Sequence, residues 1–165
     1  MQYSNKAYLL IGGNVGDRVS ALNKARALLS LGAGNISAAS HMYETAPWGI
    51  AEQASFLNQA LLLETSLSVE ELMHYILHAE EEIGRVRAEK YGPRIIDIDI
   101  LLFNREVYNL PTVTVPHHQL INRRFALQPL EEIAARYIHP ILHKTISQLL
   151  AECPDSLPVQ VYNEA

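Results

Sequence analysis

The order of the predicted strands and helices indicates an α+β fold: a ferredoxin-like βαββαβ antiparallel sheet covered by helices, with extra C-terminal helices. Two observations lead to this prediction. Four segments have strand character, and the segments after the first and the third have helical periodicity. The second and third strands follow each other without a helix between them, which disfavours a doubly wound parallel sheet.

The first half of this pattern occupies the N-terminal third of the chain. AYLLIGG at residues 7–13 is an apolar run that ends in two glycines, as a buried strand before a tight turn does. Apolar residues then recur at helical spacing, which predicts a helix over 18–31 that ends at Gly32. Residues 35–43 are moderately strand-like, and 44–55 are predicted to form a loop because they contain proline and glycine.

The second half begins with FLNQALLLET at residues 56–65, a clear strand candidate. Ser68 and Glu71 have the spacing of a capping box and predict the start of an amphipathic helix. Gly84 is expected to end that helix, and the apolar run at 95–103 predicts the last strand of the sheet.

Further elements are predicted toward the C-terminus. VTV at residues 113–115 is a short strand candidate, and residues 125–137 suggest a helix that is interrupted or restarted at Pro129. Thr145 and Gln148 have capping-box spacing and predict one more helix.

The composition is that of a soluble globular protein. The 165 residues are enough for a single domain spanning 1–165, with 48% hydrophobic and 19% charged residues. The net charge of −5 gives no general attraction to nucleic acid or to an anionic membrane. Cys153 is the only cysteine, and no signal peptide or membrane-spanning run is visible. A cytoplasmic enzyme or binding protein is therefore expected.

The strand IIDIDILLF at 95–103 carries two carboxylates in an apolar run. Because side chains alternate along a strand, the face expected to carry both acids consists of Ile95, Asp97, Asp99, Leu101 and Phe103. The acids then lie roughly 6.6–7 Å apart along the strand. Partly desolvated like charges repel, so either one carboxyl group is protonated or cations neutralise the pair. Two hard oxygen donors on one face suit Mg²⁺, which completes its shell with water and substrate phosphates.

On its own, an Asp-x-Asp pair is more often two solvated or salt-bridged acids on an edge strand. Several basic residues near the pair change this interpretation. They are Arg85, Arg87, Lys90, Arg94, Arg123 and Arg124. A solvated loop would explain the basic group alone, whereas acids and arginines together indicate an Mg²⁺-nucleotide site.

Other motifs are less specific. GGNVGDR at residues 12–18 matches neither the dinucleotide fingerprint nor the P-loop, so a tight strand-to-helix turn is predicted. His117 and His118 lie where a side chain can reach a phosphate, but their spacing is not that of a zinc site. The aromatic residues best placed to stack on a flat ligand are Trp48, Phe56 and Phe125. Burial in the core is the alternative for each ring.

One stretch closely resembles the signature of a known enzyme family. In GRVRAEKYGPRIIDIDILLF, Gly-Pro-Arg precedes an Asp-x-Asp strand, as in the 6-hydroxymethyl-7,8-dihydropterin pyrophosphokinases of folate biosynthesis. IGGNVGDR is similar to the family's opening strand and turn, YETAPWG to its first substrate loop and FLNQALLLET to its second strand. TVPHHQLINRRF resembles its later nucleotide-binding stretch, so the likeness covers about residues 7 to 133 in the family's order.

The resemblance implies transfer of the pyrophosphoryl group of ATP to the hydroxymethyl group of the reduced pterin, giving the pterin diphosphate and AMP. By matching position, the catalytic residues would be Arg85, Arg94, Asp97 and Asp99, the two acids holding two Mg²⁺ ions. The ATP contacts would be Arg85, Arg87, Tyr91, Arg94, Ile100, Thr114, His117, His118 and Arg123. The pterin contacts would be Thr45, Ala46, Trp48, Phe56, Asn58, Tyr91, Asp97 and Phe125. The expected partner is the small-molecule substrate, a reduced pterin, and no nucleic acid or membrane is expected to bind. The protein is expected to be a monomer or weak homodimer.

The sequence departs from the family's pattern at a few positions. Tyr91 stands where a Trp is common, Ala88 where some members have Lys, Thr112 where some have Arg, and His118 where Tyr can occur. These differences leave individual ATP contacts open. Two rival functions remain: another Mg²⁺-dependent nucleotidyl- or phosphotransferase with the same acids, and a non-catalytic nucleotide- or pterin-binding module. AMP as the product would exclude the first, and the complete set of acids and arginines argues against the second.

Overall fold

The computed structural model describes residues 3–45, 54–84 and 95–163. Its elements in chain order are β1 (Asn5–Gly13), α1 (Arg18–Gly32), β2 (Asn35–Ala39), β3 (Tyr43–Thr45), β4 (Phe56–Thr65), α2 (Val69–Ile83), β5 (Asp97–Phe103), β6 (Tyr108–Asn109), β7 (Thr114–Val115), the 3₁₀ turn η1 (Leu120–Asn122), α3 (Arg124–Ala134), α4 (Ile146–Ala151) and β8 (Val159–Val161). No helix in this part of the chain has the length and apolar character needed to cross a bilayer.

The main sheet has the strand order β5-β1-β4-β3-β8, and β2 also pairs with β4. All of these pairings are antiparallel, and β1 lies between β4 and β5. The predicted α+β fold with an antiparallel sheet and covering helices is therefore confirmed. Three features differ from the prediction. The second strand is divided into β2 and β3, β3 extends to Thr45 and so takes the first two residues of the predicted loop at 44–55, and β8 adds a strand near the C-terminus. The strands β6 and β7 form a small separate sheet.

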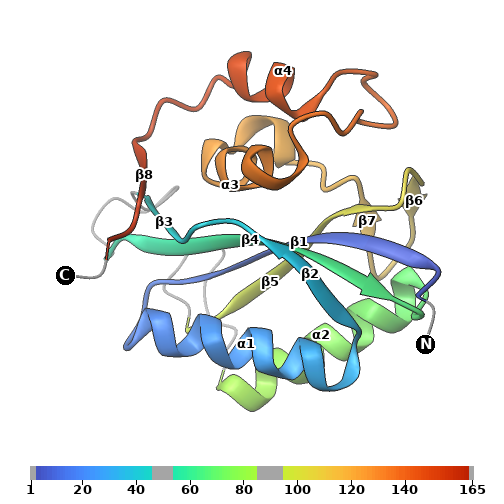
Figure 1. Ribbon diagram of the computed structural model, residues 1–165, viewed down its shortest axis with the longest axis vertical. Coiled ribbons are helices and arrows are strands. Elements are labelled where there is room, and N and C mark those ends of the chain that lie inside the picture. The colour runs from blue at the N-terminus through green and yellow to red at the C-terminus, as the bar shows by residue number, and fades with distance from the viewer. Residues whose placement is uncertain (1–2, 46–53, 85–94, 164–165) are drawn as a thin grey trace.

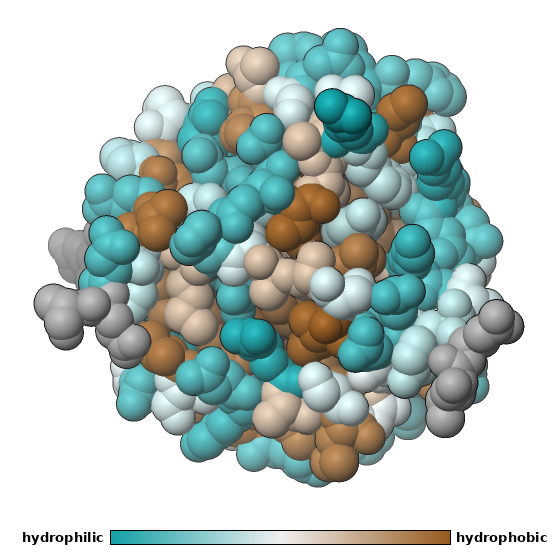
Figure 2. Space-filling view, in the orientation of Figure 1, coloured by the Kyte–Doolittle hydropathy of each residue, from teal (hydrophilic) through white to brown (hydrophobic). Residues whose placement is uncertain are grey.

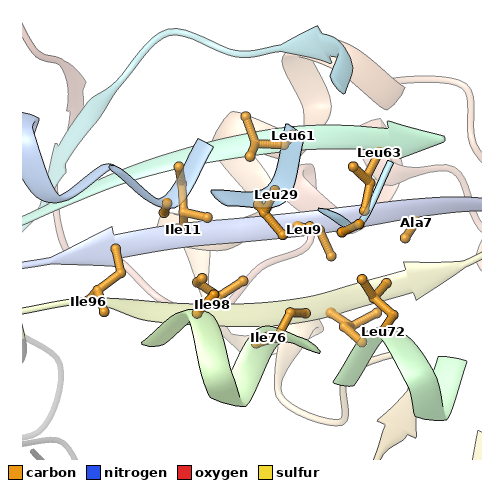
Figure 3. Packing of buried hydrophobic residues seen from close by; sticks show 14 of the residues in the cluster. Ala7, Leu9, Ile11, Leu29, Leu61, Leu63, Leu72, Ile76, Ile96 and Ile98 are labelled. Atoms are coloured by element: carbon orange, nitrogen blue, oxygen red, sulfur yellow. The ribbon is translucent and has the colours of Figure 1, made fainter. Parts of the chain in front are cut away.

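Helices cover both faces of the sheet. In Figure 1, α1 and α2 lie below it, and α3 and α4 lie above it. The buried apolar residues form two clusters that correspond to these layers. The α1 and α2 layer includes Leu29, Leu72 and Ile76, which Figure 3 shows against Leu9 and Ile98 of the sheet. On the face shown in Figure 2, apolar residues appear as patches scattered among hydrophilic ones.

The predicted helix ends are confirmed where local chemistry determines them. The capping box of α2 is complete, because Ser68 accepts from the Glu71 amide and Glu71 accepts from the Ser68 amide. Gly84 ends that helix in the left-handed conformation, with φ of 107°, which costs glycine little. Thr145 and Gln148 form the same reciprocal pair at the start of α4.

The expectation that Pro129 interrupts the third helix is wrong. α3 runs from Arg124 through Pro129 to Ala134. Leu127 and Leu130, on either side of the proline, are fully buried in the second cluster. This burial holds both halves of the helix against the sheet, which offsets the missing backbone hydrogen bond of the proline.

The expected alternation of the last strand is also wrong at its two ends: Ile95 lies before the start of β5 at Asp97, and a bulge interrupts the other end. Phe103 and Ile95 pack with the first cluster, whereas Leu101 and Leu102 both belong to the second. The β1/β5 register shifts between Tyr8 and Leu9, and such a bulge reverses the faces beyond it. Phe103 therefore does not share a face with the two acids.

Candidate active site

Asp97 and Asp99 lie on β5, the strand at one end of the main sheet. Asp97 pairs with Gly12 of β1, and Asp99 pairs with Leu10. The alternating residues Ile98 and Ile100 are buried against α1 and α2, whereas Leu10 belongs to the α3 side. Both carboxylates are half-buried on this α3 side, so the prediction that they share a face is confirmed.

A buried glutamate on α2 holds the strand between the two acids. The backbone N–H of Ile98 donates to Oε2 of Glu80 over 2.8 Å. Glu80 is only 3% exposed, and its carboxylate supplies an acceptor to β5, which is an edge strand of the sheet that the described residues form. This contact was not predicted from the sequence. The available signal was an acid adjacent to Ala79 on the apolar stripe of the helix, where a solvated carboxylate is not expected.

Gly12 allows a side chain from β4 to lie across β1. Gly12 pairs with Asn58 on one side and with Asp97 on the other. A Cβ atom on Gly12 would lie 2.0 Å from Oδ1 of Asn58 and 3.0 Å from the backbone oxygen of Leu57. The Asn58 carboxamide thus occupies the space that any other residue at position 12 would fill. Gly12 was predicted only as part of a turn, a role that Gly16 has with its φ of 69°.

The carboxamide of Asn58 carries a hydrogen-bond donor that is not used within the protein. Asn58 is 4% exposed, and its Nδ2 has no hydrogen-bond partner among the residues that the structure describes. A buried donor without an acceptor costs about 1–3 kcal/mol. A ligand with an acceptor placed over Gly12 would remove this cost.

Three residues expected to contact the pterin lie on the same face as Asp97. Thr45 pairs with Phe56, and Tyr43 pairs with Asn58. Because Phe56 and Asn58 are two positions apart on β4, their side chains point to the same side of the sheet. Thr45, Phe56 and Asn58 therefore border one region, next to the row that contains Asp97.

A second region of the candidate site is a cavity of about 250 Å³ that Asp99 helps to line. Four of the predicted ATP residues line it together with Asp99. They are Ile100, Thr114, His117 and His118. Thr112 and Val113 also contribute to its wall. The structure thus brings together a group of residues that the sequence places up to 18 positions apart, from Ile100 to His118.

The ring of His117 is held as a neutral hydrogen-bond donor. Burial, with smaller contributions from the charge of Arg123 and from His118, lowers the pKa of His117 to about 4. Its Nδ1 accepts the backbone N–H of Gln119 over 3.2 Å. The proton of the neutral ring is therefore on Nε2. A neutral N–H donor in this cavity suits a phosphate or base oxygen.

Arg123 and Phe125 lie side by side at the start of α3. Arg123 is the residue before the helix, and its guanidinium carbon lies 5.6 Å from the centre of the Phe125 ring. Phe125 is partly buried against the second cluster. A residue predicted to contact ATP therefore touches one predicted to contact the pterin.

The predicted residues Ala46, Trp48, Arg85, Arg87, Tyr91 and Arg94 lie outside the described residues.

Comparisons with known proteins give a consistent result. Residues 8–135 match the family model of 7,8-dihydro-6-hydroxymethylpterin-pyrophosphokinase (HPPK). The 2-amino-4-hydroxy-6-hydroxymethyldihydropteridine pyrophosphokinase of Bacillus subtilis is 44% identical over 131 residues, covering 79% of this chain and 78% of the relative. The enzyme of the same name from Aquifex aeolicus is 43% identical over 145 residues, covering 88% and 90%.

The fold is also similar to solved structures. The crystal structure of wild-type Plasmodium falciparum HPPK-DHPS with pteroate superposes with a TM-score of 0.74. The match covers 90% of this chain, but only 44% of that longer chain, at 18% sequence identity. At this identity the similarity concerns the fold alone.

Proposed function

Because this chain belongs to the 7,8-dihydro-6-hydroxymethylpterin-pyrophosphokinase family, we propose that its active site extends from the Asp99 cavity to the surface over Gly12. The chain is a pyrophosphokinase of folate biosynthesis: it transfers the pyrophosphoryl group of ATP to the hydroxymethyl group of 6-hydroxymethyl-7,8-dihydropterin, releasing AMP.

The main support for this active site is the position of the two acids, which lie between the cavity and the surface over Gly12. Asp99 lines the cavity with His117 and Thr114, while Asp97 lies in the row that continues through Gly12 to Asn58. ATP in the cavity and a pterin over Gly12 would therefore meet at these carboxylates. An in-line transfer requires this arrangement of donor and acceptor.

We assign Asp97 and Asp99 as the ligands of two Mg²⁺ ions. The donor set fits this metal, since Mg²⁺ is commonly held by one or two carboxylates and completes its shell with substrate phosphates and water. Both acids are half-buried on one face, where their mutual repulsion favours a bound cation. When bound, Mg²⁺ neutralises phosphate charge and supports the alignment of the attacking and leaving oxygens.

The pterin would be held by groups that the protein places in advance. The buried Nδ2 of Asn58 would donate to an acceptor on the edge of the ring, which satisfies a donor without a described partner. Phe56 and Phe125 would stack on the two faces of the ring. With the ring fixed, its hydroxymethyl group would lie beside Asp97. Positioning of this kind replaces an encounter in solution by a pre-aligned reaction.

The chemical step needs no covalent intermediate on the protein. The hydroxymethyl oxygen attacks the β-phosphorus of ATP, the bond between the β-phosphorus and the oxygen bridging to the α-phosphate breaks, and AMP leaves. The hydroxyl proton passes to solvent, with Asp97 placed to orient the O–H group. Nε2–H of His117 would donate to a phosphate oxygen in the cavity. The arginines Arg85 and Arg94, outside the described residues, are proposed to neutralise the transferred group.

The direct test is an assay with ATP, Mg²⁺ and the reduced pterin, in which the nucleotide product is identified. AMP together with the pterin diphosphate is expected. ADP would indicate a phosphotransferase, and free pyrophosphate with a nucleotidyl adduct would indicate a nucleotidyltransferase. Binding of both ligands without any product would indicate a non-catalytic binding module.

We also propose that the chain forms a single domain and acts as a monomer or weak homodimer. Sedimentation velocity can test the oligomeric state.

The depressed pKa of His117 predicts a pH-dependent part of the stability. The folded-state pKa of about 4 lies below the ordinary value of 6.5, so the unfolded chain takes up this proton first as the pH falls. The associated stability is fully present above pH 6.5 and is lost as the pH falls toward 4. The upper limit of the loss is roughly 3 kcal/mol, at about 1.4 kcal/mol per pH unit.

Urea unfolding of the wild type and of His117→Gln at pH 7 and pH 4 checks this prediction. The wild type is expected to lose about 2–3 kcal/mol more than the variant over this interval. His118→Gln provides the control: it removes only one of the smaller contributions to the lowered pKa of His117, so it should keep most of the pH dependence of the wild type. Equal pH dependence in the wild type and His117→Gln would contradict the assignment of a buried neutral ring.

A further inference from the structure

The short strand β3 is held by more contacts than its length suggests. It has 3 residues, Tyr43 to Thr45, and ends at a residue that we place in the pterin site. A strand of this length has little stability of its own. Contacts from the α1 side, from the α3 side and from the C-terminal strand nevertheless meet on it.

On the α1 side, Arg18 joins β3 to the beginning of β4. Nη1 of Arg18 lies 2.6 Å from Oε2 of Glu44, and it also donates to the backbone oxygen of Ser55 over 3.0 Å. The side chains of Arg18 and Glu44 are only 22% and 31% exposed, so solvent weakens this pair less than a surface ion pair. Ser55 directly precedes Phe56, which means that one guanidinium group ties together the residues beside Thr45 and Phe56.

Along the outer edge, the C-terminal strand β8 pairs with every residue of β3. Thr45 pairs with Val159 and Tyr43 with Val161. The next residue, Tyr162, donates its backbone N–H to the oxygen of Met42 over 2.8 Å. Its ring faces Arg18, with the guanidinium carbon 5.4 Å from the ring centre, within the range of a cation–π contact. The C-terminal strand and α1 thus converge on the same arginine, as their neighbouring positions in Figure 1 allow.

On the opposite face, α3 holds the same strand. The hydroxyl group of Tyr43 donates to Oε1 of Glu132 over 2.6 Å. Burial and the Glu132 carboxylate both raise the pKa of Tyr43, so the hydroxyl group keeps its proton and remains a donor. Glu132 also accepts the backbone N–H of His41 just before the strand.

We propose that Arg18, together with Tyr162 of the C-terminal segment, positions the pterin-binding residues Thr45 and Phe56 before the substrate binds. This inference rests on the proposed function of Thr45 and Phe56. A binding surface that is ordered in advance does not lose conformational freedom when the ligand binds, so its affinity is higher. Arg18 and Tyr162 act through β3 and β4, and neither needs to touch the pterin or ATP.

The main test compares Arg18→Met with Lys24→Met. Both changes remove one positive charge from α1, but Lys24 is exposed on the helix surface, and the described residues show no hydrogen bond or ion pair between it and β3. For Arg18→Met, the KM of the pterin is expected to rise about tenfold, equivalent to roughly 1.4 kcal/mol. The KM of ATP should stay within about twofold of the wild type, because β3 and β4, through which Arg18 acts, carry none of the proposed ATP contacts. Lys24→Met should leave both constants unchanged.

A second variant separates positioning from general stability. Tyr162→Leu keeps apolar bulk but removes the aromatic face under Arg18, so the pterin KM should rise about threefold while the KM of ATP does not change. Combined with Arg18→Met, it should add little, since both changes act through one contact. Equal changes in both KM values, or a lower midpoint of thermal unfolding with an unchanged pterin KM, would overturn the proposal. Release of AMP by the wild type tests the proposed function separately.

Discussion

Replacing either Asp97 or Asp99 with alanine should abolish pyrophosphoryl transfer while the protein remains folded. Each carboxylate is proposed to hold Mg²⁺ at the point where the cavity meets the surface over Gly12. Loss of one such electrostatic group should lower kcat by about a thousandfold. The strand itself should persist, because the alternating residues Ile96, Ile98 and Ile100 are buried in the first cluster. Each change also removes one of two like charges on this face and so relieves their mutual repulsion, which favours the folded protein.

The measurement is AMP release under saturating ATP and Mg²⁺, with Mg²⁺ binding followed by calorimetry in the presence of a non-hydrolysable ATP analogue. Glu64→Ala is a matched control, because Glu64 lies near the C-terminal end of β4, six residues along the strand from Asn58 and paired with Lys6. It should retain wild-type activity. Full activity in either aspartate variant would exclude the two-metal assignment, and circular dichroism would show whether the fold persists.

Replacing Gly12 with alanine should weaken pterin binding nearly as strongly as removing the Asn58 side chain. The new Cβ would lie 2.0 Å from Oδ1 of Asn58, far inside van der Waals contact, and 3.0 Å from a backbone oxygen that cannot easily move. The carboxamide must therefore leave its place over β1. Loss of its hydrogen bonds to the ring should raise the dissociation constant about 30- to 100-fold, equivalent to roughly 2–3 kcal/mol.

A double-mutant cycle provides the control for this prediction. Gly12→Ala, Asn58→Ala and the double variant should bind the pterin with similar affinity, because Gly12→Ala acts only by displacing the Asn58 side chain. Affinity for the ATP analogue should be unchanged in all three variants. Wild-type pterin affinity in Gly12→Ala would show that the Asn58 carboxamide tolerates the Cβ or does not bind the ring. Additive losses would show that Gly12 has a separate role.

Much of the fold was predictable because short-range patterns determine it. The bounds of α2 and β4 agree with the sequence prediction, since the capping box, the apolar stripe and the terminal glycine lie within one segment. The first helix was also predicted almost to its last residue, because its apolar residues recur at helical spacing within one segment. The division between β2 and β3 was not predicted, because both strands take their places by pairing with β4, a distant segment.

The candidate site likewise contains residues that could be predicted from the sequence and residues whose roles depend on distant contacts. The cavity residues Ile100, Thr114 and His117 were predicted from the resemblance to a known family, and the structure brings them together. Gly12 and Glu80 were not named. Their roles depend on contacts with Asn58 and Ile98, which are 46 and 18 positions away in the sequence. The roles assigned to Arg85 and Arg94 remain predictions from the sequence.

The sequence by itself determined that Asp97 and Asp99 share one face, since alternation along a strand is a property of the local backbone. It could not determine how far that face extends. The register shift between β1 and β5 moves Phe103 to the opposite side, and pairing register is set between strands. The tertiary structure alone placed Asn58 across Gly12 and brought Tyr162 to Arg18. Such contacts join segments that are far apart in the chain, and only the packed sheet brings them together.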